Sequence, residues 1–195
     1  MDSVEAAMIE NDKPPSGSRS WLLAIMLVGA AAIGITLLMK QSMQPVRSSS
    51  PRVGKPFPAL KVEGWLNGPG PAADELAGKI LVVDAWAYWC GPCRMAAPGL
   101  IEFERKYRDR GVVFLGLTSE GSESLSLSQK FLDATGIPWP NGYGAVEPLS
   151  TLEADSIPVV WIVGRDGRII DEILGYDPTH AAVKAGIERA LAQQP

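Results

Sequence analysis

A short apolar segment that leads into two closely spaced cysteines places the strongest constraint on this chain. Ile80–Val83 is apolar and mostly β-branched, as in a buried strand, and Cys90-Gly91-Pro92-Cys93 follows at the expected start of a helix. On a first helical turn, free backbone N–H groups and the positive end of the helix dipole stabilise an anion. An exposed Cys90 at this position would therefore ionise near neutral pH. The segment predicts thiol–disulfide exchange.

The composition argues against other uses of the cysteine pair. The 195 residues contain two cysteines, both in this motif, so a framework of structural disulfides is excluded. A zinc site needs four ligands, and the chain adds one distant histidine, His180, which we expect to be a solvated surface residue. Covalent haem attachment needs a histidine after the second cysteine, where Arg94 stands. We therefore expect no metal and no cofactor.

The first 56 residues differ in composition from the rest of the chain. Residues 1–20 are polar and predict a disordered tail. Residues 21–39 form a run of 19 positions without a charge, long enough to cross the roughly 30 Å hydrocarbon core of a bilayer. This run predicts a transmembrane anchor. Residues 40–56 are rich in serine, proline and basic residues and predict a tether, so we expect the globular domain to cover residues 57–195.

A cleaved signal peptide is the main alternative for the apolar run. Its apolar region is usually shorter and ends near an Ala-x-Ala-like site, whereas this run ends in Met39-Lys40-Gln41, so an uncleaved anchor is favoured. Basic residues are more frequent after the run than before it, which by itself would leave the large domain in the cytoplasm. Long domains cross membranes largely regardless of charge, so the charge pattern leaves the side of the membrane open.

The remaining sequence alternates between strand and helix patterns. A strand–helix–strand order predicts a parallel pair with a right-handed crossover, and Asp166-Gly167 between two apolar runs predicts a hairpin. Together they predict an α/β fold with a central mixed sheet flanked by helices. The expected strands are 80–85, 112–117, 157–163 and 168–174, with a short edge strand within 57–65; the expected helices are 93–110, 122–135 and one opening at Asp177-Pro178, with a helical turn at 74–78 and a loop at 137–144.

Several of these segments resemble the thioredoxin family. Val83–Cys93, with the sequence VDAWAYWCGPC and Pro98 shortly after it, resembles the thioredoxin active site, and Ser156-Ile157-Pro158 resembles the family's strand entry. The N-terminal apolar run, the Phe57-Pro58 start and a helix inserted before residue 137 resemble the membrane-anchored TlpA/ResA-like branch. The resemblance covers about residues 53–195 and implies a thioredoxin-like fold preceded by one transmembrane helix. Gly91-Pro92 departs from that branch and is the pair typical of general thioredoxins.

The motif assigns a different role to each of its two cysteines. Cys90 attacks a client disulfide to form a mixed disulfide, and Cys93 resolves that intermediate by attacking Cys90. Asp84 lies in the expected buried strand, where loss of solvation would raise its pKa. The position of Asp84 fits equally a general base for Cys93 and a structural aspartate bonded to backbone, and the resemblance to thioredoxin favours the base.

The same resemblance implies residues that bind the client. Trp89, Gly91 and Pro92 would form the rim around Cys90. Pro158 is expected to follow a cis peptide bond and to face the disulfide, while Ile157 offers its backbone to an extended client. An ordinary X-Pro bond is cis in only about 5% of cases in folded proteins, so this expectation depends on the resemblance.

The expected function is that of a membrane-tethered thiol–disulfide oxidoreductase that reduces protein disulfides in the periplasm or an equivalent space. Its partners would be disulfide-containing proteins, a transmembrane thiol-transfer protein that supplies electrons, and the lipid bilayer around residues 21–39. An acidic net charge of −4 without a basic cluster argues against nucleic acid. A disulfide oxidase or isomerase, and a redox-inactive binding module with this fold, remain alternatives. Gly91-Pro92 favours a reducing couple, as in thioredoxin at about −270 mV.

Overall fold

The computed structural model describes residues 50–193. The predicted tail, the predicted anchor at residues 21–39 and most of the predicted tether lie outside these residues. None of the helices within residues 50–193 combines the length and the hydropathy that a bilayer span requires.

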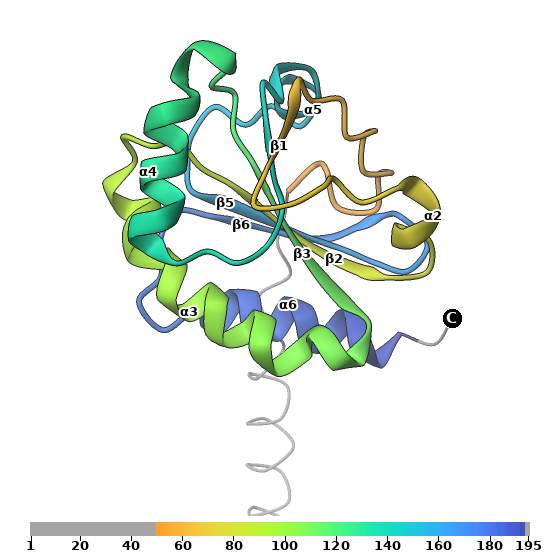
Figure 1. The fold of residues 1–195 in the computed structure, drawn as a ribbon. Coiled ribbons are helices and arrows are strands. Elements are labelled where there is room, and N and C mark those ends of the chain that lie inside the picture. The colour runs from red at the N-terminus through yellow and green to blue at the C-terminus, as the bar shows by residue number, and fades with distance from the viewer. Residues whose placement is uncertain (1–49, 194–195) are drawn as a thin grey trace, which may run out of the picture. The chain divides into compact units, whose positions relative to one another are not determined.

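A six-stranded mixed sheet forms the centre of the described part of the chain, with the strand order β1-β4-β3-β2-β5-β6 (Figure 1). All six residues of β2 (Ile80–Ala85) are buried, as expected for a strand covered on both faces. β2 pairs in parallel with β3 (Val112–Leu117) and antiparallel with β5 (Val159–Val163), so the mixed sheet predicted from the sequence is confirmed. The remaining strands are β1 (Gly64–Leu66), β4 (Asn141–Tyr143) and β6 (Ile169–Leu174).

Alternate residues of β2 face two separate hydrophobic clusters, as the two-residue period of a strand requires. Ile80 and Val82 face a cluster that includes side chains of α3 (Gly91–Tyr107), α4 (Leu125–Thr135) and α6 (Ala181–Ala192). The other face packs against α5 (Val146–Thr151), the small helix α2 (Ala73–Leu76) and the segment that leads into β1. Asp84 continues the alternation of Ile80 and Val82, so its side chain belongs to the face covered by α3 and α6.

Contacts with two distant segments hold Trp86, the residue just after β2, in place. Trp86 stacks on Phe131 with 4.7 Å between ring centroids, and its Nε1–H donates to Oδ1 of the fully buried Asn141 at 2.9 Å. A Cβ atom on Gly116 would lie 1.8 Å from that same Oδ1. Glycine is therefore required in β3 at this point, because any side chain would displace the amide that orients Trp86.

Several sequence-based boundaries are corrected by the structure. The helix expected at residues 93–110 begins at Gly91 and ends at Tyr107, followed by a 3-10 turn at Arg108–Arg110. The last helix begins at Ala181 rather than beside Pro178, because the Asp177 carboxylate accepts hydrogen bonds from the backbone N–H of Thr179 and of Ala181 and holds a turn there. The predicted loop at 137–144 contains β4, and α5 was not predicted.

Candidate active site

A disulfide joins Cys90 and Cys93 at the start of α3, with the two Cα atoms 5.3 Å apart. Cys90 is the N-cap residue of this helix, and its Sγ accepts a hydrogen bond from the backbone N–H of Cys93 at 3.1 Å. Gly91 and Pro92 form the beginning of the first turn. Proline is favoured there because a backbone N–H at this position would have no partner within the helix. The predicted position of the motif, at the junction of a buried strand and a helix, is confirmed.

The prediction that Cys90 is exposed is wrong for this disulfide form of the protein. Cys90 is 3% exposed and Cys93 is 4% exposed, and both belong to the hydrophobic cluster beneath α3. Cys93 lies on the buried side of α3, and the disulfide joins Cys90 to it there. In contrast, Gly91 and Pro92 are exposed, and Trp89 is 64% exposed.

Asp84 is a buried acid on the same face of the sheet as Cys93. The residue is 4% exposed, and its Oδ1 atom has no hydrogen-bond partner among the described residues. Burial raises the pKa of Asp84 from 3.8 to about 7, because desolvation disfavours the carboxylate. The predicted direction of this pKa shift is confirmed. An acid with this pKa exchanges its proton near neutral pH.

The Ile157-Pro158 peptide bond is cis, as predicted. Strand pairing places this bond at the same edge of the sheet as the disulfide motif: Ala85 at the end of β2 is opposite Val159 at the start of β5. Pro158 immediately precedes β5, and the segment from Trp86 to Cys90 follows β2, so both connections emerge at the same edge of the sheet. Pro158 is buried, whereas Ile157 is partly exposed and contacts both hydrophobic clusters.

Glu120 accepts a hydrogen bond from the indole of Trp89 and was not predicted from the sequence. The Nε1–H of Trp89 donates to Glu120 Oε1 at 2.9 Å, and the hydroxyl of Thr118 donates to the other oxygen of Glu120. β2 and β3 are parallel, so their carboxyl ends lie at the same edge of the sheet. A polar residue just after β3 could therefore have been expected near the motif that follows β2. Trp89 and Ile157 both line a groove of about 500 Å³, and Val146 of α5 lines it as well.

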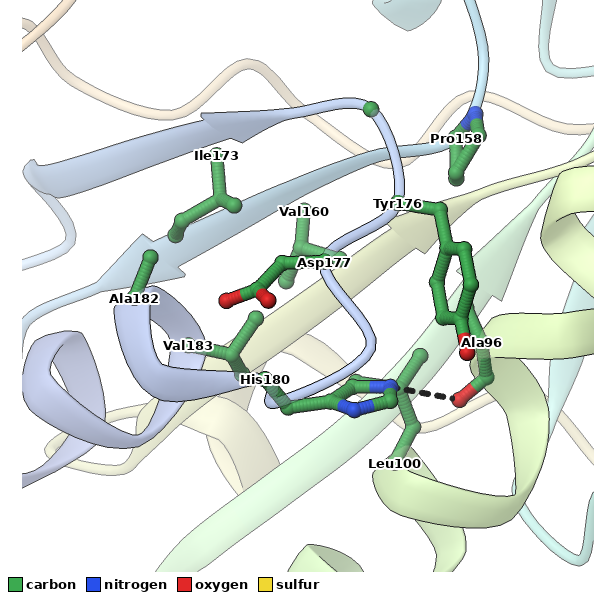
Figure 2. Close-up of a pocket in the computed structure, with 11 residues that line it drawn as sticks. Ala96, Leu100, Pro158, Val160, Ile173, Tyr176, Asp177, His180, Ala182 and Val183 are labelled. Carbon is green, nitrogen blue, oxygen red and sulfur yellow. Dashed lines mark hydrogen bonds between the residues drawn. The ribbon is translucent and has the colours of Figure 1, made fainter.

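The expectation that His180 is a solvated surface residue is wrong. His180 is partly buried, and its Nε2 lies 3.0 Å from the backbone oxygen of Ala96 in α3 (Figure 2). Its ring packs edge-on against Phe103 and Tyr176, with centroid distances of 6.1 and 5.8 Å. The sequence contained no local signal for this contact, which joins two helices that are far apart in the chain.

Comparisons with known proteins agree with this geometry. The chain is 30% identical over 155 residues to the thiol:disulfide interchange protein HelX of Rhodobacter capsulatus, covering 77% of this chain and 84% of HelX. It is 26% identical over 157 residues to the thiol-disulfide oxidoreductase ResA of Bacillus anthracis, again with 77% and 84% covered.

Solved structures show the same fold. The crystal structure of a putative thiol:disulfide interchange protein DsbE from Chlorobium tepidum superimposes with a TM-score of 0.64 at 21% identity, covering 73% of this chain and all of that one. The fold is therefore thioredoxin-like. The family model described as Redoxin matches residues 52–191, and the chain accordingly belongs to the Redoxin family.

Proposed function

We propose that this protein is a membrane-tethered thiol–disulfide oxidoreductase that reduces disulfides in proteins outside the cytoplasm. The observation that carries this proposal is the Cys90–Cys93 disulfide across the first turn of α3, at the sheet edge that also carries the cis Ile157-Pro158 bond. The activity itself follows from the family and from this pair, since both relatives described above are named for thiol–disulfide chemistry. The reducing direction and the tether are the further steps of the proposal.

The reaction moves two electrons from the dithiol to the client. The Cys90 thiolate attacks one sulfur of the client disulfide, a mixed disulfide forms, and the other client sulfur leaves as a thiolate. The Cys93 thiolate then attacks Cys90 Sγ, which forms the observed disulfide and releases the reduced client. The backbone N–H of Cys93, already directed at Cys90 Sγ, and the helix dipole stabilise the negative charge on Cys90.

Asp84 is proposed to accept the proton that Cys93 loses during the second step. The acid shares a face of the sheet with Cys93, and its raised pKa of about 7 matches a proton transfer near neutral pH. Its unpartnered Oδ1 leaves one oxygen free to act. A structural aspartate satisfied by backbone donors would have no such free oxygen.

The client is proposed to bind at the rim around the disulfide. Trp89, Gly91 and Pro92 are the exposed residues of the motif, and the bond between Trp89 and Glu120 orients the indole beside the cysteines. Ile157 and Pro158 lie at the same sheet edge. The backbone of Ile157 is proposed to pair there with an extended segment that carries the client cysteine.

The tether and the electron supply are proposed from the sequence. Residues 21–39 are free of charge and long enough to span a bilayer, and residues 40–49 lead from this run to the folded domain. Outside the cytoplasm a reductant must receive electrons through the membrane, so the proposed donor is a transmembrane thiol-transfer protein. No nucleic acid takes part.

Replacing Cys90 by serine should abolish insulin-disulfide reduction, with a loss of at least about 1,000-fold, because serine is not a nucleophile in this exchange. Cys93→Ser should instead accumulate a covalent mixed disulfide with the client, detected by mass spectrometry and reversed by dithiothreitol. Lys184→Ala on the exposed side of α6 is the matched control and should retain full activity. Equal activity in wild type and Cys90→Ser would leave only a binding module.

The pKa of Asp84 also predicts how stability depends on pH. The folded state keeps its Asp84 proton up to about pH 7, whereas the unfolded chain releases it near 3.8, so stability falls as the pH rises through this window. Asp84→Asn removes this loss. Between pH 4 and pH 8, the free energy of unfolding of the variant should therefore rise by roughly 4 kcal/mol relative to that of wild type. Urea unfolding of the oxidised proteins measures the gain, with the exposed Asp109→Asn as control. A difference in stability between wild type and Asp84→Asn that does not change with pH would contradict the raised pKa of Asp84.

The reduction potential of the pair separates a reductase from an oxidase or isomerase. Equilibration with dithiothreitol and glutathione buffers should give a value near that of thioredoxin, about −270 mV, as expected for Gly91-Pro92 between the cysteines. A potential at or above about −180 mV, in the range of the isomerases, would refute the reducing direction.

The side of the membrane is tested by protease treatment of intact spheroplasts that express the full chain. The protein should remain in the membrane fraction after a carbonate wash, and added protease should digest the domain while a cytosolic marker stays intact. Protection of the domain together with the marker would place it in the cytoplasm, and release by carbonate would exclude the anchor.

A further inference from the structure

We call the line along which α3 and α6 meet near Ala96 the seam. His180, the one histidine of the chain, bridges the two helices there. His180 stands at the N-cap of α6 in a left-handed conformation, with φ +49°, and its Nε2 faces the Ala96 oxygen at 3.0 Å. Figure 2 shows the imidazole directed from α6 toward Ala96 and Leu100 of α3. A Cβ atom on Gly99 would lie 2.5 Å from Cε1 of this ring, so glycine leaves the space that the imidazole occupies on α3.

Strand pairing connects this seam to Asp84. Asp84 in β2 is directly opposite Val160 in β5, and Val160 is directly opposite Ile173 in β6. Directly opposite residues of antiparallel strands place their side chains on the same face of the sheet. Asp84, Val160 and Ile173 therefore form one row beneath α3 and α6.

Two members of that row line the space that His180 closes. Val160 and Ile173 border a cavity of about 20 Å³, together with Ala96, Leu100 and His180. This volume holds about one water molecule, and its lining is mostly apolar, a combination that disfavours a stable water site. Water that enters through this seam reaches Val160, the neighbour of Asp84.

We infer that His180 is a positioning residue for the exchange reaction: its imidazole, bound to the Ala96 oxygen, seals the seam between α3 and α6 and keeps the Asp84 row free of water. The inference rests on the proposed role of Asp84 as the base for Cys93. Sealing matters to the reaction because an acid that is hydrated would lose its proton well below neutral pH and would no longer exchange it with a thiol.

No described charge offers a competing explanation for the environment of Asp84, since burial alone accounts for its raised pKa. The buried or partly buried titratable groups around this face are Cys93 of α3, which is bonded to Cys90; Tyr107 of α3, whose hydroxyl donates to Glu188 of α6; Tyr176, Asp177 and His180 before α6; and the Asp171–Arg189 ion pair, one row further along the sheet. The degree of hydration is therefore the variable that the seam controls.

The test is a titration of the Asp84 carboxyl group by carbon-13 NMR in the oxidised full chain, where neither cysteine titrates. The Asp84→Asn spectrum assigns the resonance. His180→Ala should lower the Asp84 pKa by about one unit, because water enters where the ring stood. Gly99→Ala should lower it in the same direction, since the added methyl group displaces the ring while alanine favours the helix.

Leu152→Ala is the control for a general loosening of the core. Leu152 is buried in the cluster on the opposite face of the sheet, so its truncation should leave the Asp84 pKa within about 0.2 units of wild type. A change below about 0.3 units in both His180→Ala and Gly99→Ala, or an equal fall in Leu152→Ala, would overturn the inference. Since the titration needs no turnover, that result would leave the exchange activity of Cys90 and Cys93 untouched, whereas failure of the proposed function appears in the insulin assay.

Discussion

The complete burial of β2 is the constraint on which the rest of this structure depends. A central strand with both faces covered needs a partner on each edge and a layer on each face, and β3, β5, α3 and α5 provide them. Because β3 runs parallel to β2 and β5 runs antiparallel, the carboxyl ends of β2 and β3 meet the start of β5. The disulfide motif, Glu120 and Pro158 are the residues that emerge at this one edge.

The same burial produces the chemistry of the site. The strand that delivers Cys90 to the start of α3 also carries Asp84 into an apolar layer, where its carboxyl group is desolvated. A helix N-terminus favours a negative charge on the first cysteine, and the dry layer disfavours a negative charge on the acid behind it. In the proposed mechanism, these opposite effects prepare Cys90 to attack and Asp84 to receive a proton. Burial of Asp84 also lowers the stability of the folded state at neutral and alkaline pH.

The segment between β3 and β5 borders this edge of the sheet on one side. β4 extends the sheet, α5 follows it, and Val146 of α5 lines the groove beside Trp89. Glu120 connects this segment to the motif through its bond to the Trp89 indole. On the other side of the sheet, His180 connects α6 to α3 in a comparable way. The exchange site is thus held from both faces of the sheet by polar contacts between distant segments.

The sequence by itself determined the parts of this protein that depend on local patterns. The apolar runs predicted the main strands, and the spacing of Cys90 and Cys93 after a buried strand predicted the helix start and the chemistry. The position of Asp84 in that strand was enough to predict its raised pKa, and the resemblance of Ile157-Pro158 to a known motif predicted the cis bond. Only the tertiary structure decided the burial of both sulfur atoms, the strand β4, the partner of Trp89 and the place of His180. Three residues are too few to show a strand period, and the contacts of Glu120 and His180 join residues 31 and 84 positions apart, so no local pattern contains them.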